Sequence, residues 1–301
     1  MKVAVTTSSF AEFSDEPLRL LQERGLAYVL NPHGRTLTED EAISLLAGCI
    51  GVVAGTEPLT ARVMDALPAL RVISRCGAGL DNVDAQAANI KNITVCTTPD
   101  GPTRAVAELT LGYALDLARH ISRMDAELKA GIWKKRMGNL LEGRKVGVIG
   151  YGRIGKAVAR LFTLMGCDVR FADPFVEHGD HERMELDALL AWADLASLHC
   201  AKPKGGQALL DATRLANMPK GAWLINAARG GLVDEAALCK ALQSGHIGGA
   251  ALDVFDKEPY AGPLAACATV ILTPHIGSYA KETRMDMEVD SVNNLIAALG
   301  I

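Results

Sequence analysis

Residues 150–155 read Gly150-Tyr151-Gly152-Arg153-Ile154-Gly155, and this stretch decides the fold of the chain. An apolar run at 146–149 precedes it, and a helical pattern over 156–165 follows it. A second strand pattern at 168–172 ends at Asp173. A glycine triplet between a strand and a helix, followed by an acidic residue at the end of the next strand, is typical of a dinucleotide-binding βαβ unit.

Each glycine of this stretch has a predicted role. Gly150 permits a tight turn, Gly152 lets the backbone approach a pyrophosphate, and Gly155 lets the helix pack closely against the strand. The phosphates then face the N-terminus of the helix. Asp173 is predicted to accept hydrogen bonds from the ribose hydroxyls and to repel a 2′-phosphate. Proline and phenylalanine follow it, not arginine or lysine, so the sequence predicts NAD over NADP.

Nearly half of the 301 residues precede this stretch, and they also alternate strand and helix patterns. Alternation of this kind is typical of an α/β fold with parallel strands. Strands are predicted at 2–6, 27–30, 50–54, 71–74, 195–198, 223–226, 250–252 and 270–272. Helices are predicted at 16–25, 42–47 with a cap at 38–41, 60–67, 103–129 and 281–299. The length and pattern predict two α/β domains.

The composition excludes several classes of function. A net charge of -4 gives no basic footprint for nucleic acid. No apolar run is long enough to span a bilayer and the N-terminus lacks a signal-peptide pattern, so no membrane partner is expected. Seven scattered cysteines without a Cys-x-x-Cys motif indicate reduced thiols and a cytoplasmic protein. No histidine has convincing metal-ligand spacing, including His178 and His181 in an acidic loop, so no metal site is expected.

Three polar residues stand where predicted strands end, which is where open α/β sheets bind ligands. Arg229 follows the strand at 223–226, Glu258 follows the strand at 250–252, and His275 follows the strand at 270–272. Taken alone, each also has an ordinary interpretation: a capping or surface arginine, a surface acid, and a structural histidine.

Together the three residues form a coherent set. A histidine bonded to a carboxylate is held in one orientation, and its cation is stabilised. Such a pair can give or take the proton of an alcohol while a nicotinamide gives or takes hydride. The planar fork of Arg229 suits a substrate carboxylate and can polarise the neighbouring carbonyl. The set predicts reversible oxidation of a 2-hydroxy acid.

The chain resembles the D-isomer-specific 2-hydroxyacid dehydrogenases over nearly its whole length. The likeness is carried by the glycine stretch with Asp173 and by residues 74–84 (SRCGAGLDNVD), 106–110 (VAELT), 226–234 (NAARGGLVD), 251–255 (ALDVF) and 274–277 (PHIG). The family's catalytic arginine, glutamate and histidine fall on Arg229, Glu258 and His275. The resemblance implies an NAD-dependent oxidoreductase that interconverts a D-2-hydroxy acid and its 2-keto acid.

The resemblance also implies an architecture. A Rossmann-type NAD domain, expected over 99–279, is inserted into a flavodoxin-like substrate domain made of 1–98 and 280–301, and homodimers form mainly through the NAD domain. It implies cofactor contacts at Gly150, Gly152, Arg153, Ile154, Gly155, Asp173, Cys200, Ala227, Ala228, Arg229, Asp253, His275 and Gly277. It implies substrate contacts at Ser9, Arg75, Cys76, Gly77, Ala78, Arg229 and His275.

Within the family the chain is most similar to the phosphoglycerate dehydrogenase-like branch. Residues 6–10 (TTSSF), Arg75 and the basic segment 133–136 (WKKR) support this likeness. Arg75 and the basic segment are candidates for binding a second anionic group of the substrate, and the alternative is a solvated basic loop. Residues 53–58 lack the arginine and lysine of well-studied phosphoglycerate dehydrogenases, and Ala78 replaces their threonine. Both departures count against 3-phosphoglycerate as the substrate.

Two alternative functions remain open. A phosphite-type dehydrogenase uses a similar arginine, glutamate and histidine. A corepressor-like binding protein of this fold senses NAD(H) and recruits partners without turning over a keto acid.

Overall fold

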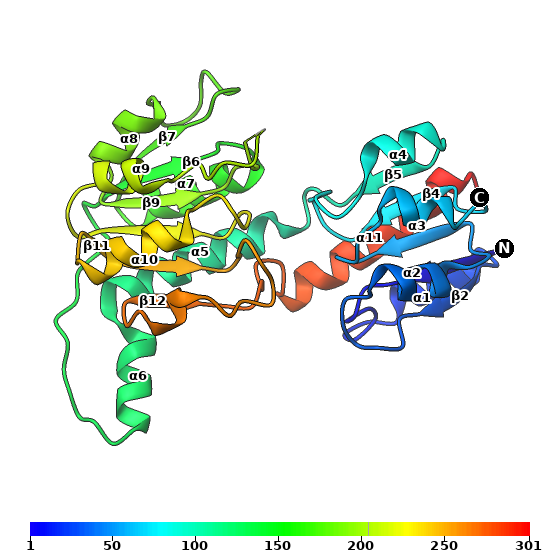
Figure 1. Cartoon of the computed structure of the whole chain (residues 1–301), viewed down its shortest axis with the longest axis horizontal. Helices are drawn as coiled ribbons and strands as arrows, with labels where there is room; N and C mark the ends of the chain where they lie inside the picture. Colours follow the sequence, from blue (N-terminus) through cyan, green and yellow to red (C-terminus); the bar gives the residue numbers. More distant parts are fainter. Residues whose placement is uncertain (204) are drawn as a thin grey trace. The chain divides into compact units, whose positions relative to one another are not determined.

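The structure is a computed structural model that describes residues 1–203 and 205–301. The chain divides into two compact units. Unit 1 comprises residues 1–102 and 278–301, and unit 2 comprises residues 103–277 (Figure 1). Unit 2 is therefore inserted into unit 1 along the sequence, and both chain termini lie in unit 1.

Unit 1 contains a five-stranded parallel sheet in the order β2-β1-β3-β4-β5. The strands are β1 (Lys2–Val5), β2 (Ala27–Leu30), β3 (Gly51–Ala54), β4 (Val72–Arg75) and β5 (Thr94–Thr97). The helices are α1 (Glu16–Glu23), α2 (Glu39–Leu46), α3 (Ala61–Asp65), α4 (Ala85–Ile90) and α11 (Lys281–Leu299). This strand order is the flavodoxin-like order, whose switch point lies between β1 and β3.

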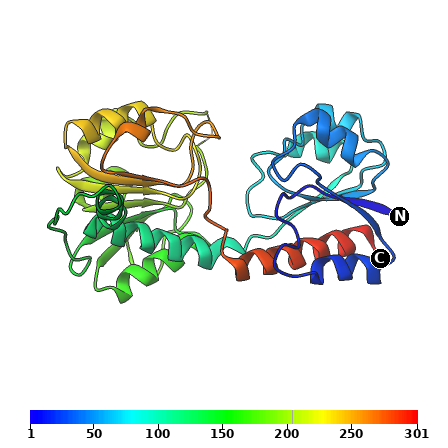
Figure 2. The ribbon, with the colours of Figure 1, turned by 90° about the horizontal axis from the view of Figure 1, so that it is seen from below.

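The helices of unit 1 cover both faces of its sheet. Apolar side chains of α2, α3 and α4, such as Leu46 and Val63, form one core. Leu21 of α1 and Leu295 of α11 belong to the core on the other face, where Figure 2 shows these two helices side by side. A parallel sheet buried on both faces explains why β3 is apolar along its length.

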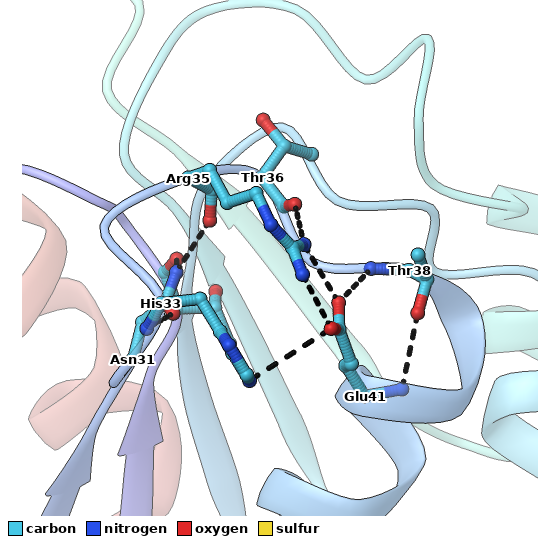
Figure 3. A network of polar contacts seen from close by, with 7 residues as sticks. Asn31, His33, Arg35, Thr36, Thr38 and Glu41 are labelled. Atoms are coloured by element: carbon cyan, nitrogen blue, oxygen red, sulfur yellow. Dashed lines mark hydrogen bonds and ion pairs between the residues drawn. The ribbon is translucent and has the colours of Figure 1, made fainter.

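The start of α2 shows how local sequence fixes an element of unit 1 (Figure 3). Thr38 caps the helix: its side chain accepts from the Glu41 amide, and the Glu41 carboxylate accepts from the Thr38 amide at 2.8 Å. This capping box satisfies two amides at the helix end. Arg35 donates to both carboxylate oxygens of Glu41, at 2.9 and 2.6 Å. The cap predicted at 38–41 is therefore present.

Unit 2 contains a seven-stranded sheet in the order β12-β11-β10-β9-β6-β7-β8, with every pair parallel. The strands are β6 (Lys145–Ile149), β7 (Asp168–Ala172), β8 (Glu182–Arg183), β9 (Leu195–Leu198), β10 (Ala222–Asn226), β11 (Ile247–Leu252) and β12 (Val270–Leu272). This is the Rossmann order, with its switch point between β6 and β9.

Helices also cover both faces of the unit 2 sheet (Figure 2). One face carries α5 (Pro102–Arg119) and α7 (Arg153–Leu164), with Tyr113 and Phe162 in its core. The other carries α8 (Leu186–Trp192), α9 (Ala212–Asn217), α10 (Glu235–Gln243) and the 3-10 helix η1 (Pro263–Ala266). The predicted Rossmann-type and flavodoxin-like fold class is confirmed.

The prediction of one long helix at 103–129 is wrong in one respect. The helix is interrupted at His120, which has a φ of 56° and separates α5 from α6 (Ile121–Lys129). A left-handed residue cannot continue a right-handed helix, so the chain changes direction there. The sequence patterns also missed the strands β5 and β8 and the helices α4, α8, α9 and α10, whereas β2, β7, β9, β12 and α11 have the predicted bounds.

No helix among the described residues is long and apolar enough to cross a membrane.

Candidate functional site

The glycine turn after β6 has the shape that the sequence predicts. Gly150 has a φ of 92°, and a Cβ there would come within 2.6 Å of the His199 backbone. A Cβ on Gly155 would lie 1.9 Å from the carbonyl oxygen of Gly150, so only glycine lets α7 approach the turn. A Cβ on Gly152 would meet no atom within 4 Å. The backbone at Gly152 therefore borders open space, as a site that accepts a pyrophosphate requires.

The N-terminus of α7 begins directly at this open position. Gly152 is its N-cap, and no side chain caps the helix. Arg153 and Ile154 form the first turn. Amides of an uncapped first turn are donors for an anion, and the helix dipole favours negative charge there. The residues present at this turn thus fit the phosphates of a dinucleotide.

Asp173 lies at the end of β7 and ties this strand to the glycine turn. Its Oδ2 accepts from the Tyr151 amide at 2.7 Å, and its Oδ1 accepts from the Phe175 amide at 2.8 Å. The carboxylate is partly exposed, and each oxygen has a second lone pair. Its placement beside the turn agrees with a ribose contact.

Three further residues that the resemblance assigned to the cofactor lie at neighbouring strand ends. Cys200 follows β9, and burial raises the pKa of its thiol to about 11, so the thiol is neutral. Ala227 and Ala228 follow β10 and are buried. These small or neutral side chains stand at the carboxyl edge of the same sheet as the glycine turn.

Arg229 is positioned by the residues that end β10. The Asn226 side chain accepts from the Ala228 amide at 3.1 Å and donates to the carbonyl of Arg229 at 3.0 Å. Arg229 Nη1 donates to the carbonyl of Ala228 at 2.7 Å. Asn226 therefore closes a tight turn that holds the arginine at the strand end, and Arg229 itself stays partly exposed.

His275 and Glu258 form a direct pair. His275 Nδ1 lies 2.8 Å from Glu258 Oε2, and the side chains are 49% and 37% exposed. The other oxygen of Glu258 accepts from the Phe255 amide at 3.1 Å, which fixes the carboxylate. With Nδ1 engaged, Nε2 is the imidazole nitrogen that can exchange a proton with a substrate.

The pair shifts the titration of both groups. The hydrogen bond and charge of Glu258 raise the pKa of His275, with a contribution from Asp253, while burial and the charge of Arg229 oppose this rise. Burial by itself favours the neutral form of Glu258, but the bond and charge of His275 and the Phe255 amide lower its pKa overall. The geometry therefore favours an imidazolium paired with a carboxylate.

Asp253 holds the backbone beside His275. This carboxylate is 1% exposed and accepts from the amides of Ile276 at 2.8 Å and Gly277 at 2.7 Å. His275 has a φ of 55°, and a left-handed residue lets successive amides converge on one anion. The resemblance placed Asp253 and Gly277 near the cofactor. In the structure the Asp253 carboxylate is engaged with the loop that carries His275.

Sequence reasoning missed two residues of this region, Tyr113 and Thr273. The Thr273 hydroxyl lies 2.6 Å from Asp253 Oδ1, and the Tyr113 hydroxyl contacts both groups. Tyr113 belongs to the helical pattern of α5, where a tyrosine looks like an ordinary core residue. No local motif connects it with Asp253, which lies 140 positions away in the sequence.

The substrate contacts implied only by resemblance lie at strand ends in unit 1. Ser9 follows β1 and accepts from Arg284 at 3.4 Å. Arg75 ends β4 and donates to the carbonyl of Cys76 at 2.5 Å. Cys76 and Gly77 are buried, and Ala78 is exposed.

The basic segment 133–136 lies beyond α6 in unit 2. Lys134 and Lys135 are exposed, but Arg136 donates to the carboxylate of Glu127 at 3.0 Å through Nε. Glu127 therefore already balances one of the three positive charges.

Two other histidines have structural partners. His181 bridges the Tyr151 hydroxyl at 2.6 Å and the Thr163 hydroxyl at 2.8 Å, so within its acidic loop this histidine contacts α7. His199 bonds Ser197 at 2.8 Å, and burial lowers its pKa to about 3. Among the residues that the structure describes, no cluster of His, Cys, Asp and Glu could hold a metal ion.

The strand order, the glycine turn and the charged pair define a class of protein: a Rossmann-type dinucleotide-binding protein with an acid–base pair at the carboxyl edge of its sheet.

The chain belongs to the family of D-isomer specific 2-hydroxyacid dehydrogenases. Residues 111–277 match the family model described as "D-isomer specific 2-hydroxyacid dehydrogenase, NAD binding domain". The chain is 38% identical to D-3-phosphoglycerate dehydrogenase of Pongo abelii over 275 aligned residues. The aligned region covers 88% of this chain and 51% of the relative. The chain spans about half the length of such relatives. The predicted family and its NAD-binding domain are confirmed.

Solved structures agree with this assignment. The TT0316 protein from Thermus thermophilus has a TM-score of 0.93 and 37% identity, with 100% of this chain and 97% of that chain covered. A glyoxylate reductase from Paecilomyes thermophila has a TM-score of 0.88 and 26% identity, with 99% and 95% covered. The similarity thus extends over both units.

Proposed function

We propose that this protein is an NAD-dependent oxidoreductase that interconverts a D-2-hydroxy acid and its 2-keto acid. The observation that carries the proposal is the 2.8 Å contact between His275 and Glu258, because it supplies an oriented acid–base group. This pair belongs to the same unit as the glycine turn. Family membership and the similarity to phosphoglycerate dehydrogenases and a glyoxylate reductase support the same reaction.

Three side chains share the chemistry. Arg229 binds the substrate carboxylate through its planar guanidinium and polarises the carbonyl. During reduction, protonated His275 donates from Nε2 to the keto oxygen, and during oxidation the neutral imidazole removes the hydroxyl proton. Glu258 is a positioning residue that stabilises the imidazolium.

The residues of the glycine turn hold the cofactor. Gly150 and Gly155 permit the tight turn and the close approach of α7, Gly152 leaves room for the pyrophosphate, the first turn of α7 supplies amides, and Asp173 accepts from the ribose hydroxyls. Bound NAD supplies the hydride acceptor or donor. The Asp173 carboxylate favours NADH over NADPH, so comparable kcat/KM values for the two cofactors would contradict this assignment.

The substrate is an anionic 2-keto or 2-hydroxy acid. Ser9, Arg75, Cys76, Gly77 and Ala78 are the candidate contacts, since they follow β1 and β4 at the carboxyl edge of the unit 1 sheet. Residues 53–58 carry neither arginine nor lysine. A small keto acid without a phosphate therefore fits this chain better than 3-phosphohydroxypyruvate.

A substrate panel tests the proposed function. NADH oxidation is followed at 340 nm with glyoxylate, hydroxypyruvate, pyruvate and 3-phosphohydroxypyruvate, and phosphite is tested with NAD in the opposite direction. Turnover of at least one keto acid is expected. Phosphite oxidation alone would favour a phosphite-type dehydrogenase. Tight NADH binding by fluorescence, without any turnover, would favour the corepressor-like binding protein.

Unit 2 also carries an apolar surface that fits a homodimer. The surface comprises α6 and the segment that follows it, with large apolar side chains that are 51–93% exposed: Ile121, Leu128, Ile132, Trp133, Met137 and Leu140. Exposed apolar side chains gathered on one segment indicate a protein contact. The occupant that we propose is a second copy of the chain, since the family resemblance implies homodimers that form through this domain and the exposed apolar side chains lie on one segment of it.

Light scattering after gel filtration measures the association. A dimer is expected for the wild type and a monomer for Trp133→Glu. Ile90→Glu in unit 1 is the control, because Ile90 is also exposed, at 72%, and lies outside the apolar surface. A dimer that persists in Trp133→Glu, or a monomeric wild type, would contradict the proposed association.

We also infer a cytoplasmic location, which the seven unpaired cysteines support.

A further inference from the structure

A chain of buried hydroxyl groups ends on the carboxylate of Asp253. Tyr113 is 4% exposed, and its hydroxyl contacts Thr273 Oγ1 and lies 3.3 Å from Asp253 Oδ1. Thr273 Oγ1 lies 2.6 Å from the same oxygen. A threonine hydroxyl has one hydrogen and a carboxylate only accepts, so Thr273 donates to Asp253 and Tyr113 donates to Thr273.

This chain reaches the loop of His275 through Asp253. The same Oδ1 that receives the Thr273 hydroxyl accepts the Ile276 amide at 2.8 Å, and Oδ2 accepts the Gly277 amide at 2.7 Å. These amides directly follow His275, whose left-handed backbone they stabilise. A helix residue, two strand ends and the loop are thus connected by hydrogen bonds within unit 2.

We propose that Tyr113 is a positioning residue for His275 and acts through Thr273 and Asp253. The inference rests on the proposed acid–base function of His275. Tyr113 touches neither His275 nor Glu258 by a hydrogen bond among the described contacts, so its effect passes through the carboxylate of Asp253.

The physical basis is the charge that faces His275. Its charged neighbours are Glu258, Asp253 and Arg229: the two carboxylates favour the imidazolium, and the guanidinium disfavours it. Hydroxyl groups that donate in series polarise one another and draw negative charge away from the terminal acceptor. Removal of the Tyr113 hydroxyl leaves more charge on Asp253. The imidazolium is then favoured more strongly, and the loop loses part of its support.

Tyr113→Phe is the direct test, since it removes the hydroxyl and keeps the buried ring. We expect kcat to fall about three- to tenfold, which corresponds to one hydrogen bond. KM for NADH should stay unchanged, and the pH at which reduction declines should move higher. Tyr28→Phe is the matched control, because it removes a surface hydroxyl in unit 1 that bonds only Gln22, at 3.1 Å, among the described contacts.

Thr273→Val provides a second route to the same hydrogen-bond chain, and it carries the test if Tyr113→Phe does not fold. The double variant should lose less than the product of the two single losses, since both changes break one chain. The proposal would be overturned if Tyr113→Phe had the same kinetics and pH profile as Tyr28→Phe. It would also be overturned if the loss of kcat in the double variant equalled the product of the two single losses.

A measurement without turnover separates this inference from the proposed function. NMR titration of the His275 imidazole, assigned with His275→Asn, should show a higher midpoint in Tyr113→Phe than in the wild type. A wild type that reduces no keto acid would refute the proposed function, whereas an unchanged His275 midpoint would refute the role of Tyr113.

Discussion

The two units place acidic side chains at the same kind of position, the carboxyl edge of a parallel sheet, but in opposite environments. Glu57 follows β3 of unit 1, is fully buried, and lies 2.5 Å from the Thr6 hydroxyl. Glu258 follows β11 of unit 2, is partly exposed, and pairs with His275. Burial raises the pKa of Glu57, opposed by hydrogen bonds that include Thr6, whereas His275 keeps Glu258 ionised.

This comparison shows that strand-end position does not by itself define a catalytic acid. Exposure and partner decide which role the carboxyl group has. Burial of Glu57 raises its pKa, and its carboxyl group bonds the Thr6 hydroxyl, whereas the more exposed Glu258 can respond to a proton that leaves or enters with the substrate. Variants at the two edges should therefore affect different properties of the protein.

His275→Ala should have the largest effect. We expect kcat for keto-acid reduction to fall about a hundredfold or more, because the proton donor is removed. NADH binding should be unchanged, since the glycine turn is intact. Steady-state kinetics and NADH fluorescence measure these quantities, and His33→Ala in unit 1 is the control. An unchanged kcat would remove His275 from the mechanism.

Arg229→Lys should have the next largest effect. We expect KM for the keto acid to rise about tenfold or more, because an ammonium cannot form two parallel hydrogen bonds to a carboxylate. Arg19→Lys, a surface change in unit 1, serves as the control. A wild-type KM in Arg229→Lys would show that the guanidinium does not bind the substrate.

Glu258→Gln should move the pH dependence of reduction. The pKa of His275 is raised above its usual value of 6.5 in the folded protein. The imidazolium that donates the proton is therefore still present at pH 6.5, and it is lost as the pH rises through the raised pKa. Without the carboxylate charge, the decline should begin about one pH unit lower. A profile of kcat/KM between pH 5 and 9 measures the change, and a profile identical to that of the wild type contradicts the pairing.

Glu57→Gln should have the smallest effect on activity and a distinct effect on stability. The raised pKa favours the neutral acid in the folded state, so the wild type loses stability as the pH rises above about 4.5. Glutamine stays neutral, and its Tm should vary less between pH 5 and 8. The NADH dissociation constant should not change. An equally steep decline of Tm in Glu57→Gln would show that Glu57 does not titrate in this way.

Much of the fold and of the candidate site could be predicted from the sequence, because the patterns that encode them are local. The glycine stretch, Asp173 and the strands β7, β9 and β12 are each encoded by a few adjacent residues. The contact between His275 and Glu258 was predicted from their shared position at strand ends, and the structure places them 2.8 Å apart.

The rest depends on contacts between distant residues. Tyr113 meets Asp253 across 140 positions, and Thr6 meets Glu57 across 51, so no local pattern reports either contact. The break at His120 also escapes prediction, because the flanking residues favour helix on both sides. Tertiary packing overrides local preference at these points.

A single-turnover experiment tests the central claim most directly. The preformed complex of the protein with NADH is mixed with a saturating keto acid from the panel other than glyoxylate, whose product is achiral. Absorbance at 340 nm is followed, and the product is resolved by chiral chromatography. We expect rapid loss of NADH absorbance and formation of the D-2-hydroxy acid in the wild type, and neither result in His275→Ala. NADH that stays reduced in the wild-type complex with every keto acid, or an L product, would contradict the central claim.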